Sequence, residues 1–513
     1  MNHSINAAGR EVVTEINGES AIPFQGVGKY VPQNPRHAPS ISSCSNYPAD
    51  GNKLVKNLKT ALEKAGLRDG MTISTHHHFR NGDFLANQVF DLAKKMGVKG
   101  LRWFPSASFP CHEHLIPYLE DGTIERIEGS MNGPLGRFVS EGGMKGMGVL
   151  RSHGGRYQSI QDGEVRIDIA VIGAPTSDFF GNANGVSGDS ACGLLGFALG
   201  DSQYAEKVII ATDNLVEFPC IPWQIQGNHV DYVVEVERLG DPSKIISGTT
   251  QITRSPDRLL LAELTARFCD AAGIIRDGFS FQSGAGGTSL AVGEYFRKIM
   301  IEKGIRARFA RGGSNKYLVS MLEEGLVDYI LDGQTFDMEG VRSMAENPNH
   351  VWTSPFTSYN YHGKGNFAGL VDVVILGATE VDLEFNANVV THSDGYLLHG
   401  IGGWQNCLFS KTVILPIPLF RDRVPVVKEK VTTLCGPGEL IDVIVTERGI
   451  AINPRRTDLI ELTRHSNLPI KSIEELKAEA DRICGIPDPP DLDEKVVAAI
   501  KWVDGTVIDV VRQ

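Results

Sequence analysis

The sequence has few cysteines and no segment typical of secretion or membrane insertion. Its eight cysteines are scattered through 513 residues without a Cys-x-x-Cys pair, which argues against a structural zinc site or a disulfide scaffold. The opening residues, MNHSINAAGREV, lack the apolar core of a signal peptide. No run approaches the roughly 18 apolar residues of a membrane-spanning helix. We therefore expect a cytoplasmic protein that holds no metal.

An excess of basic residues and low-complexity segments are also missing. The net charge is −12 and the pI is near 5.7, which disfavours a nucleic-acid or anionic-membrane partner. Hydrophobic residues make up 42% of the chain and charged residues 22%. This is the composition of an ordinary globular protein, and the length predicts two or three domains.

One sequence pattern occurs twice. Residues 167–185 read IDIAVIGAPTSDFFGNANG, and residues 371–389 read VDVVILGATEVDLEFNANV. Upstream, RDGMTIST at 68–75 corresponds to RDGFSFQS at 276–283. Two copies of one unit in the same order indicate a duplicated fold, so positions at which the copies differ are candidates for chemistry.

Short apolar strands alternate with helical patterns. The segment at 167–172 is continuously apolar, as in a strand buried on both faces of a parallel sheet. Helical patterns are predicted at 53–66, at 259–273 and from Leu85 to Met96, where Leu85, Val89, Leu92 and Met96 recur at helical spacing. The alternation predicts an α/β fold with mostly parallel sheets.

Three segments are expected along the chain. Residues 1–50 are polar and rich in proline, serine and asparagine, so we expect an extension that wraps the surface rather than forming a core. A first domain is predicted at 51–242 and a second at 243–513. The proline-rich stretch at 485–494 should end the compact part, and a short helical tail should follow.

A glycine-rich loop, SGAGGTSLAV at 283–292, lies between a predicted strand and a predicted helix. The backbone at Gly284, Gly286 and Gly287 could approach a phosphate or an oxyanion closely, and the helix N-terminus offers unpaired N–H groups. Thr288 or Ser289 is the expected helix cap. The loop is not Gly-x-Gly-x-x-Gly, and a tight strand-to-helix turn explains it equally simply.

Glu380 is the most distinctive difference between the copies. It follows an apolar strand, where open α/β sheets place ligand sites, and the first copy has Thr176 there. A carboxylate at this point could act as a nucleophile toward a thioester or as a base. The alternative is a solvated loop glutamate.

A second glycine pair, Gly402-Gly403, occupies the positions of Ala198-Leu199 in the first copy. Successive N–H groups of such a turn could hold a developing oxyanion, although a plain turn is the alternative. The nearby Asp and Asn residues occur in both copies, which favours loop-shaping hydrogen bonds over catalysis; they are Asp178, Asn182 and Asn184 in the first copy, and Asp382, Asn386 and Asn388 in the second.

Histidine and arginine gather in the first copy. HHHFRNG at 76–82 contains His77, His78 and Arg80, with His76 and His78 on one side of an extended segment. Arginine binds carboxylates through two parallel hydrogen bonds, so this cluster favours a polycarboxylate ligand. Neighbouring histidines on opposite faces make poor metal ligands, and ordinary surface histidines remain an alternative. RSHGGR at 151–156 adds Arg151, His153 and Arg156 to this cluster in the first copy, and His362 and Lys364 in the second could also meet an anion.

Four segments together resemble the CoA-transferase superfamily and, within it, the alpha subunits of citrate lyase. They read AGLRDGMTISTHHHFRNGDFLANQV, SGAGGTSLAV, GATEVDLEFNANVVTHSDGYLLHGIGGWQN and IDVIVTERGIAINPRRTDL. The resemblance implies two related open α/β domains of the CoA-transferase type, with an active site at their interface. It assigns that site to Gly284–Val292, Glu380 and Gly400–Gly403.

The resemblance also implies an activity and partners. Such a chain exchanges the acetyl group on an acyl-carrier protein for citrate, giving the citryl-carrier protein and acetate. The carrier is the gamma subunit, whose thiol belongs to a phosphoribosyl-dephospho-CoA group, and a separate beta subunit cleaves the citryl thioester. The usual course is a ternary complex and an acyl anhydride, without a glutamyl-enzyme thioester. A homo-oligomer with no permanently bound cofactor is expected.

Some residues depart from the wider superfamily. Its relatives have a proline in the first glycine loop, where this chain has Ser289 or its neighbours, and a glycine before Asn-x-Asn, which is kept as Gly181 but replaced by Phe385. Three alternatives therefore stay open. One is a transferase or hydrolase that acts on free acyl-CoA through a Glu380 thioester; another is citramalate as acceptor; the third is a non-enzymatic scaffold.

Overall fold

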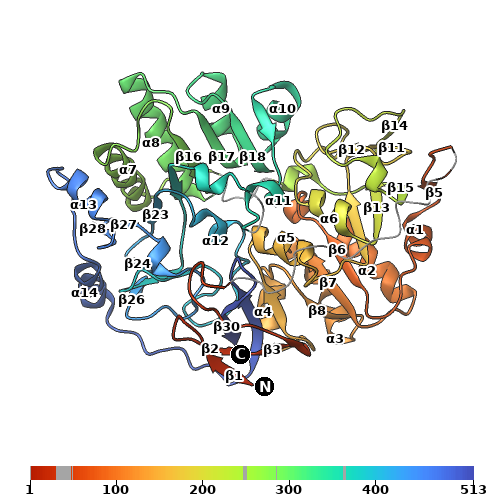
Figure 1. The fold of residues 1–513 in the computed structure, drawn as a ribbon, viewed down its shortest axis with the longest axis horizontal. Coiled ribbons are helices and arrows are strands. Elements are labelled where there is room, and N and C mark those ends of the chain that lie inside the picture. The colour runs from red at the N-terminus through yellow and green to blue at the C-terminus, as the bar shows by residue number, and fades with distance from the viewer. Residues whose placement is uncertain (1, 31–47, 49, 246–250, 285, 362–364) are drawn as a thin grey trace.

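The structure is a computed structural model, and it describes residues 2–30, 48, 50–245, 251–284, 286–361 and 365–513. Two lobes lie side by side, one for each copy of the repeat (Figure 1). We call residues 51–242 the first half and residues 243–513 the second half. These boundaries follow the sequence prediction and remain a prediction.

A parallel sheet forms the centre of each half, as predicted. In the first half the strand order is β5-β15-β13-β10-β6-β7-β8, with every pair parallel. In the second half it is β19-β18-β17-β16-β20-β23-β27-β28, parallel except for the last pair. The strands of the first sheet are Leu54–Val55, Tyr232–Glu235, Lys207–Thr212, Ile169–Gly173, Thr72–Thr75, Leu101–Pro105 and Ile124–Ile127, and those of the second are His350–Trp352, Ile330–Thr335, Phe309–Ser314, Ser280–Ser283, Val373–Ile375, Val413–Pro416, Val443–Thr446 and Gly449–Ile452.

Helices cover these sheets because their apolar faces are buried against the strands. Leu85, Val89 and Phe90 of α2 are buried, as the helical spacing predicts. The helix predicted at 53–66 is shorter than expected, since Asn57 caps its start and Leu54–Val55 form a strand instead. The described helices are α1 Leu58–Lys64, α2 Leu85–Lys95, α3 Ile116–Glu120, α4 Pro134–Ser140, α5 His153–Gln161, α6 Ala198–Tyr204, α7 Pro256–Ala271, α8 Gly287–Lys303, α9 Lys316–Glu323, α10 Met338–Glu346, α11 Pro355–Ser358, α12 Trp404–Cys407, α13 Thr457–Thr463 and α14 Ile473–Cys484.

The duplicated segment folds in the same way twice. Each half adds a small three-stranded sheet, β12-β11-β14 in the first and β22-β21-β26 in the second. In both, an aspartate after the first turn accepts hydrogen bonds from the loop backbone: Asp178 from Phe180, Gly181 and Asn182, and Asp382 from Glu384 and Asn386. The shared Asp and Asn residues therefore shape loops, as predicted. The strands are Ala183–Asn184, Thr176–Asp178 and Leu215–Val216, and Ala387–Asn388, Glu380–Asp382 and Val427–Lys428.

The predicted helical tail is wrong, because the C-terminus forms a strand pair. β29 (Val496–Lys501) and β30 (Val507–Arg512) pair with each other, and β29 also pairs with β9 (Gly148–Leu150) of the first half. Apolar residues of both strands, Ala499 and Val507 among them, fill a small core. The end of the chain thus joins the two halves.

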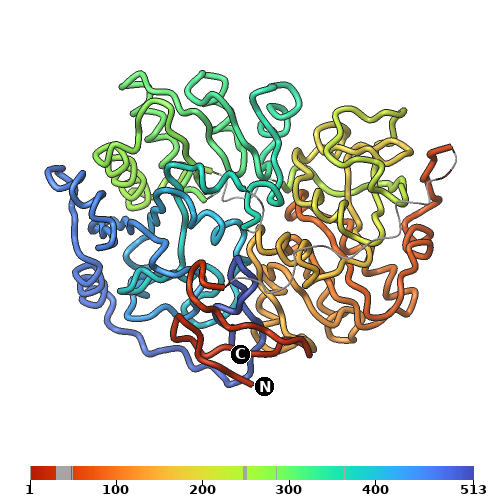
Figure 2. The backbone as a smooth tube through the Cα atoms, in the orientation of Figure 1, coloured from red at the N-terminus to blue at the C-terminus, as the bar shows by residue number. Residues whose placement is uncertain are grey.

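The N-terminal segment does more than wrap the surface. Val12, Val13 and Ile16 are buried in the same small core as the C-terminal strands. The two chain ends lie next to each other between the lobes (Figure 2). The remaining short strands are β1 His3–Ile5, β2 Glu11–Val13, β3 Glu15–Ile16, β4 Glu19–Ser20, β24 Phe420–Arg421 and β25 Val424–Pro425. None of the helices in the described ranges is sufficiently long and apolar to span a membrane.

Candidate active site

The two halves meet where α5 begins. The backbone N–H of His153 donates to the carbonyl oxygen of Gly402 at 2.7 Å, and the N–H of Gly154 donates to Asn406 Oδ1 at 3.0 Å. A Cβ at Gly154 would lie 1.9 Å from the carbonyl oxygen of Tyr359. Glycine is therefore required at residue 154 for the backbones to approach this closely.

A cavity of about 460 Å³ lies between the halves at this contact. None of the described residues that line it is an aspartate or a glutamate, although the chain as a whole is acidic. The lining side chains that can carry positive charge are His77, Arg80, Arg151 and His153 from the first half and His399 from the second. A cavity of this composition suits an anionic ligand.

His77 and His153 form the aromatic wall of this cavity. Their rings stack at 5.6 Å, and the ring of Phe197 lies 4.2 Å from His77. Burial, followed by His153, Arg80 and His78, holds the pKa of His77 well below its usual 6.5. Burial and then Arg156 lower the pKa of His153 to about 3. Both rings are therefore neutral hydrogen-bonding groups near neutral pH.

Arg80 is the cation of the HHHFRNG segment that reaches the cavity. Its guanidinium lies over the rings of Phe336, at 4.7 Å, and Phe109, at 5.6 Å. Burial lowers its pKa to about 10, so the group still carries a charge at neutral pH. The two rings hold the planar group in place while its edge can address a carboxylate.

His78, which we predicted to bind substrate, does not line the cavity. Its Nε2 is 2.7 Å from the carbonyl oxygen of Gly173, and its ring is stacked parallel to that of His76. The two rings share one side of the segment, as the sequence indicated. Side chains of an extended segment alternate, so His77 takes the cavity side and His78 packs into the first half.

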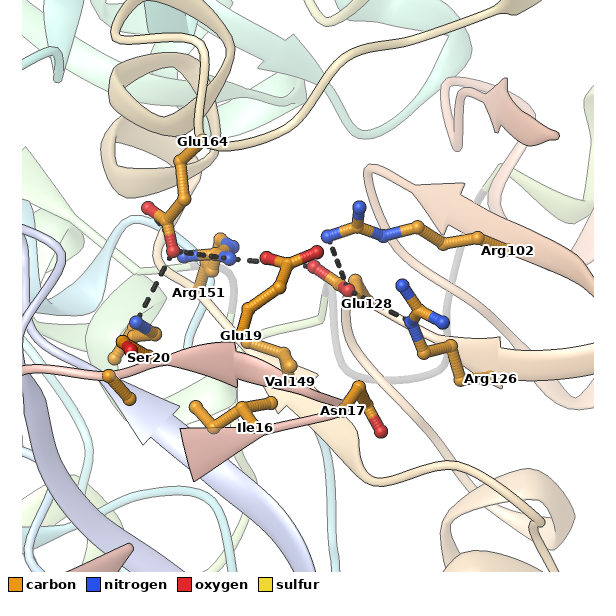
Figure 3. A pocket seen from close by; sticks show the side chains of 12 residues that line it. Ile16, Asn17, Glu19, Ser20, Arg102, Arg126, Glu128, Val149, Arg151 and Glu164 are labelled. Carbon is orange, nitrogen blue, oxygen red and sulfur yellow. Dashed lines mark hydrogen bonds and ion pairs between the residues drawn. The ribbon is translucent and has the colours of Figure 1, made fainter. Parts of the chain in front are cut away.

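Arg151 reaches the cavity wall, but the buried Glu128 and the partly exposed Glu164 hold its guanidinium (Figure 3). It lies 3.1 Å from Glu164 and 3.4 Å from Glu128. Burial lowers the pKa of Arg151, but Glu164 and Glu128 raise it by more. The hollow among these charges has about 20 Å³, which is room for a single water molecule rather than a substrate. Arg151 thus belongs to an ion-pair network and is not placed as a free ligand-binding group.

A larger cavity of about 890 Å³ adjoins the first, within the second half. Gly286, Gly287 and Ser289 at the start of α8 line it, together with Arg258 and Arg421. The helix begins at Gly287 with Gly286 as its cap, not at the predicted Thr288 or Ser289. The two cavities share a wall made of Gly284, Leu376, His399, Ile401 and Trp404.

The two glycine turns therefore line neighbouring spaces rather than one cleft. Gly402 and Gly403 line the interfacial cavity, Gly286 and Gly287 the larger one, and Gly284 lies at the junction. Among the described residues, the N–H groups of Gly402 and Gly403 donate no hydrogen bond. They can therefore stabilise negative charge that develops at the junction.

Glu380 lines neither cavity. Its side chain is fully buried on β21, where it forms an ion pair with Lys428 and accepts hydrogen bonds from the backbone N–H of Thr432 at 2.8 Å and from Asn388 Nδ2 at 3.1 Å. Burial raises the pKa of Glu380, but Lys428 and these hydrogen bonds lower it below its ordinary value. This carboxylate lines neither of the cavities that the glycine turns line, and its predicted reactive role stays a prediction.

Two further sequence-predicted residues, His362 and Lys364, lie outside the described residues. His153, which the sequence places in the same cationic cluster as Arg151, lines the cavity, whereas sequence reasoning did not identify Gln282, Gln334 and Tyr359. His153 was visible in RSHGGR, whose paired glycines mark a close backbone approach. Gln282 and Gln334 lie on strands and Tyr359 lies in a loop. The segments that such residues contact cannot be identified from one sequence.

The chain matches known families over most of its length. Residues 51–513 match the model of the family described as citrate lyase, alpha subunit (CitF). The chain is 42% identical over 463 residues to the citrate lyase alpha chain of Klebsiella pneumoniae, which covers 90% of this chain and 91% of that one. The corresponding protein of Escherichia coli (strain K12) is 41% identical with the same coverage.

Two solved structures resemble the fold. A protein from Streptococcus mutans described as the alpha subunit of citrate lyase, in complex with citrate, has a TM-score of 0.94 and 40% identity, with 99% of each chain covered. A Pseudomonas malonate decarboxylase hetero-tetramer has a TM-score of 0.61 and 18% identity, with 85% of this chain and 84% of that chain covered. The second likeness concerns the fold alone and confirms the predicted fold class.

If Glu380 is a structural carboxylate, Glu380→Gln should lower stability and largely spare catalysis. Loss of the ion pair with Lys428 should cost about 3 kcal/mol at neutral pH. Because the folded-state pKa lies below its ordinary 4.5, this contribution is present above that value and is lost as the pH falls through the folded-state pKa. Urea unfolding of Glu380→Gln and of the unsubstituted protein at several pH values measures the difference in their free energies of unfolding. This difference should become smaller at acidic pH.

The exposed Glu384→Gln, in the same loop, is the matched control and should leave stability unchanged. Acyl exchange by Glu380→Gln should stay within about tenfold of the unsubstituted protein. A loss of more than about a thousandfold in a folded variant would instead identify Glu380 as a reacting group.

Proposed function

This chain belongs to the citrate lyase alpha subunit family, a family of transferases that work with an acyl-carrier protein and with other citrate lyase subunits, and on this premise we propose where its substrates bind. Citrate occupies the interfacial cavity. The acyl thioester arm of the carrier protein occupies the larger cavity, and the acetyl group is exchanged at the wall that the two cavities share.

The observation that carries this proposal is the chemistry of the lining of the interfacial cavity. The charged Arg80 and the neutral rings of His77 and His153 face this space, and none of the described residues in its lining is acidic. Citrate carries several carboxylates and few apolar groups, so it requires such a site. The citrate bound to the Streptococcus mutans relative supports a citrate site in this family.

The larger cavity has features that suit a phosphate-bearing arm. The first N–H groups of α8 open into it at Gly286 and Gly287, and helix N-termini bind phosphate through such groups. Arg258 adds positive charge at its edge. We infer that the phosphoribosyl-dephospho-CoA group of a gamma subunit enters here, and that a beta subunit acts later on the citryl thioester.

The exchange then proceeds through an anhydride. A citrate carboxylate oxygen attacks the thioester carbonyl carbon, the C–S bond breaks, and the carrier thiolate leaves. The thiolate next attacks the citryl carbonyl of the mixed anhydride, a new C–S bond forms, and acetate leaves with the bridging oxygen. The two steps balance without a proton or an external reductant. The Gly402 and Gly403 N–H groups stabilise the oxyanion of each step.

Glu380 has no part in this route, and its burial with Lys428 disfavours the alternative that uses a glutamyl thioester and free acyl-CoA. The two adjoining ligand-sized cavities disfavour a purely non-enzymatic scaffold.

The transfer assay offers acetyl-carrier protein with isotopically labelled citrate. We expect labelled citryl-carrier protein and free acetate in equal amounts. Arg80→Gln should raise the KM for citrate about 10- to 100-fold, because a charge-assisted, two-point contact is lost. Arg80→Lys keeps the charge but loses the planar guanidinium, so its KM for citrate should lie between those of the unsubstituted protein and Arg80→Gln. The exposed Arg137→Gln should behave as the unsubstituted protein.

Acetate release without labelled carrier protein, or exchange with free acetyl-CoA but not with the carrier, would contradict this function. An unchanged KM in folded Arg80→Gln would contradict the assignment of the citrate site alone.

Citrate binding should take up protons at His77 and His153. In the ligand-free protein their low pKa values keep both rings neutral. A bound carboxylate favours the charged form and raises these values, so affinity should increase as the pH falls. Calorimetric titration in buffers of different ionisation enthalpy measures the uptake at pH 6. It should be smaller in His153→Gln, which cannot be protonated; equal uptake by both proteins would refute the role of His153.

A further inference from the structure

A buried arginine lies beside the interfacial cavity, and no described residue provides it with a counter-ion. Arg311 is on β17 and is 1% exposed. Within the part of the chain that the structure describes, its three guanidinium nitrogens have no hydrogen-bond partner. The ring of Tyr359 lies 4.4 Å from its Cζ atom. A buried guanidinium with five unused donors is costly unless an anion accompanies it.

The first half shows how such a charge is normally compensated. Arg156 is also buried, and its Nη1 and Nη2 atoms lie 2.5 and 2.6 Å from the two carboxylate oxygens of Asp201. The offset that relates Glu380 to Thr176 places Gln405 at the position of Asp201. Gln405 donates to the carbonyl oxygen of Cys435 and carries no charge. Asp201 thus supplies a carboxylate for Arg156, whereas no described carboxylate is paired with Arg311.

Several residues next to Arg311 line the interfacial cavity. Gly312 and Gly313 follow it on the strand, and Gln282 pairs with it in register on β16; all three line the cavity. Gly333 on the next strand lines it as well, and a Cβ there would lie 4.0 Å from Arg311 Nη2. A side chain at residue 333 would therefore add atoms beside Arg311 Nη2 at the cavity wall.

Gln282 adds a second group at the same point. Its Nε2 donates to Tyr359 Oη at 3.3 Å, while its Oε1 atom is buried and has no partner among the described residues. Tyr359 lines the cavity and covers one face of the Arg311 guanidinium. A polar ligand that enters past Gly333 thus meets both an unused donor group and an unused acceptor.

We propose that Arg311 and Gln282 form a second anion subsite of the interfacial cavity. It binds a carboxylate of the acceptor other than the one that attacks the thioester, while Gln282 Oε1 accepts from a hydroxyl group. The subsite selects a hydroxylated di- or tricarboxylate over a monocarboxylate such as acetate. This inference rests on the proposed function, because it requires the acceptor to bind between the halves.

Two variants test the subsite by calorimetric titration with citrate and with acetate. Gly333→Ala places a methyl group in front of Arg311 Nη2 at an ordinary contact distance, so the fold should tolerate it. Arg311→Met removes the charge at similar length. Both should weaken citrate binding about 10- to 100-fold and change acetate binding less than about threefold. Gly293→Ala on α8, where an added Cβ meets no atom within 4 Å, is the control and should bind citrate normally.

Thermal unfolding separates ligand binding from a structural role. Without citrate, Arg311→Met should unfold at the same or a higher temperature, because an uncompensated buried charge is removed. Citrate should raise the unfolding temperature of Arg311→Met by less than it raises that of the unsubstituted protein. A lower temperature without citrate together with an unchanged citrate effect would show that Arg311 is structural and would overturn the inference.

The outcomes also distinguish this inference from the proposed function. If the unsubstituted protein does not bind citrate, the proposed function fails and the subsite fails with it. If it binds citrate, and Gly333→Ala and Arg311→Met bind as tightly, only the subsite is refuted. Equal weakening of citrate and acetate by both variants would also refute it, because the subsite would then not select for a second carboxylate.

Discussion

The contact between the start of α5 and the Gly402–Gly403 turn determines the rest of the site. The hydrogen bond from His153 N–H to Gly402 brings an aromatic and cationic wall from the first half against a glycine turn from the second. Gly154 permits this approach, and Gly400 permits a similar one beside Ser130, where an added Cβ would lie 2.1 Å from the serine Cβ. Neither half has a complete site without the other.

The duplication supplies two similar frameworks, and the differences between them give the site its charge. The Asp and Asn loops and the small sheets recur in both halves. The first half balances its buried charges internally, through Arg156 with Asp201 and through the network around Glu128. The interfacial cavity, in contrast, has cations and no carboxylate in its lining. An acidic protein can therefore hold a polyanion in a local region of opposite sign.

Much of the fold could be predicted because it depends on local patterns. Continuous apolar strands such as Ile169–Gly173 and the spacing of Leu85 and Val89 are sufficient to identify a parallel sheet with covering helices. The C-terminal strands were missed because they depend on β9, which is distant in the sequence. Alternation along 76–78 already implied that His77 and His78 face opposite sides, so only one of them could reach a ligand.

The candidate site was predictable in part. The glycine turns, His77 and Arg80 line the cavities as expected, whereas Glu380 does not. A difference between repeats indicates that a position has a different role, but the role here is an ion pair with Lys428 on a neighbouring strand. Sequence spacing does not identify the residue that pairs with Glu380. It also does not show that Arg311 lacks a hydrogen-bond partner among the described residues.

A crystal structure of this chain soaked with citrate tests the central claim most directly. We expect electron density for citrate between the halves, with one carboxylate at Arg80 and His153 and another close to Gly333 and Arg311. Citrate bound only in the larger cavity beside Gly286 and Gly287, or outside both cavities, would contradict it.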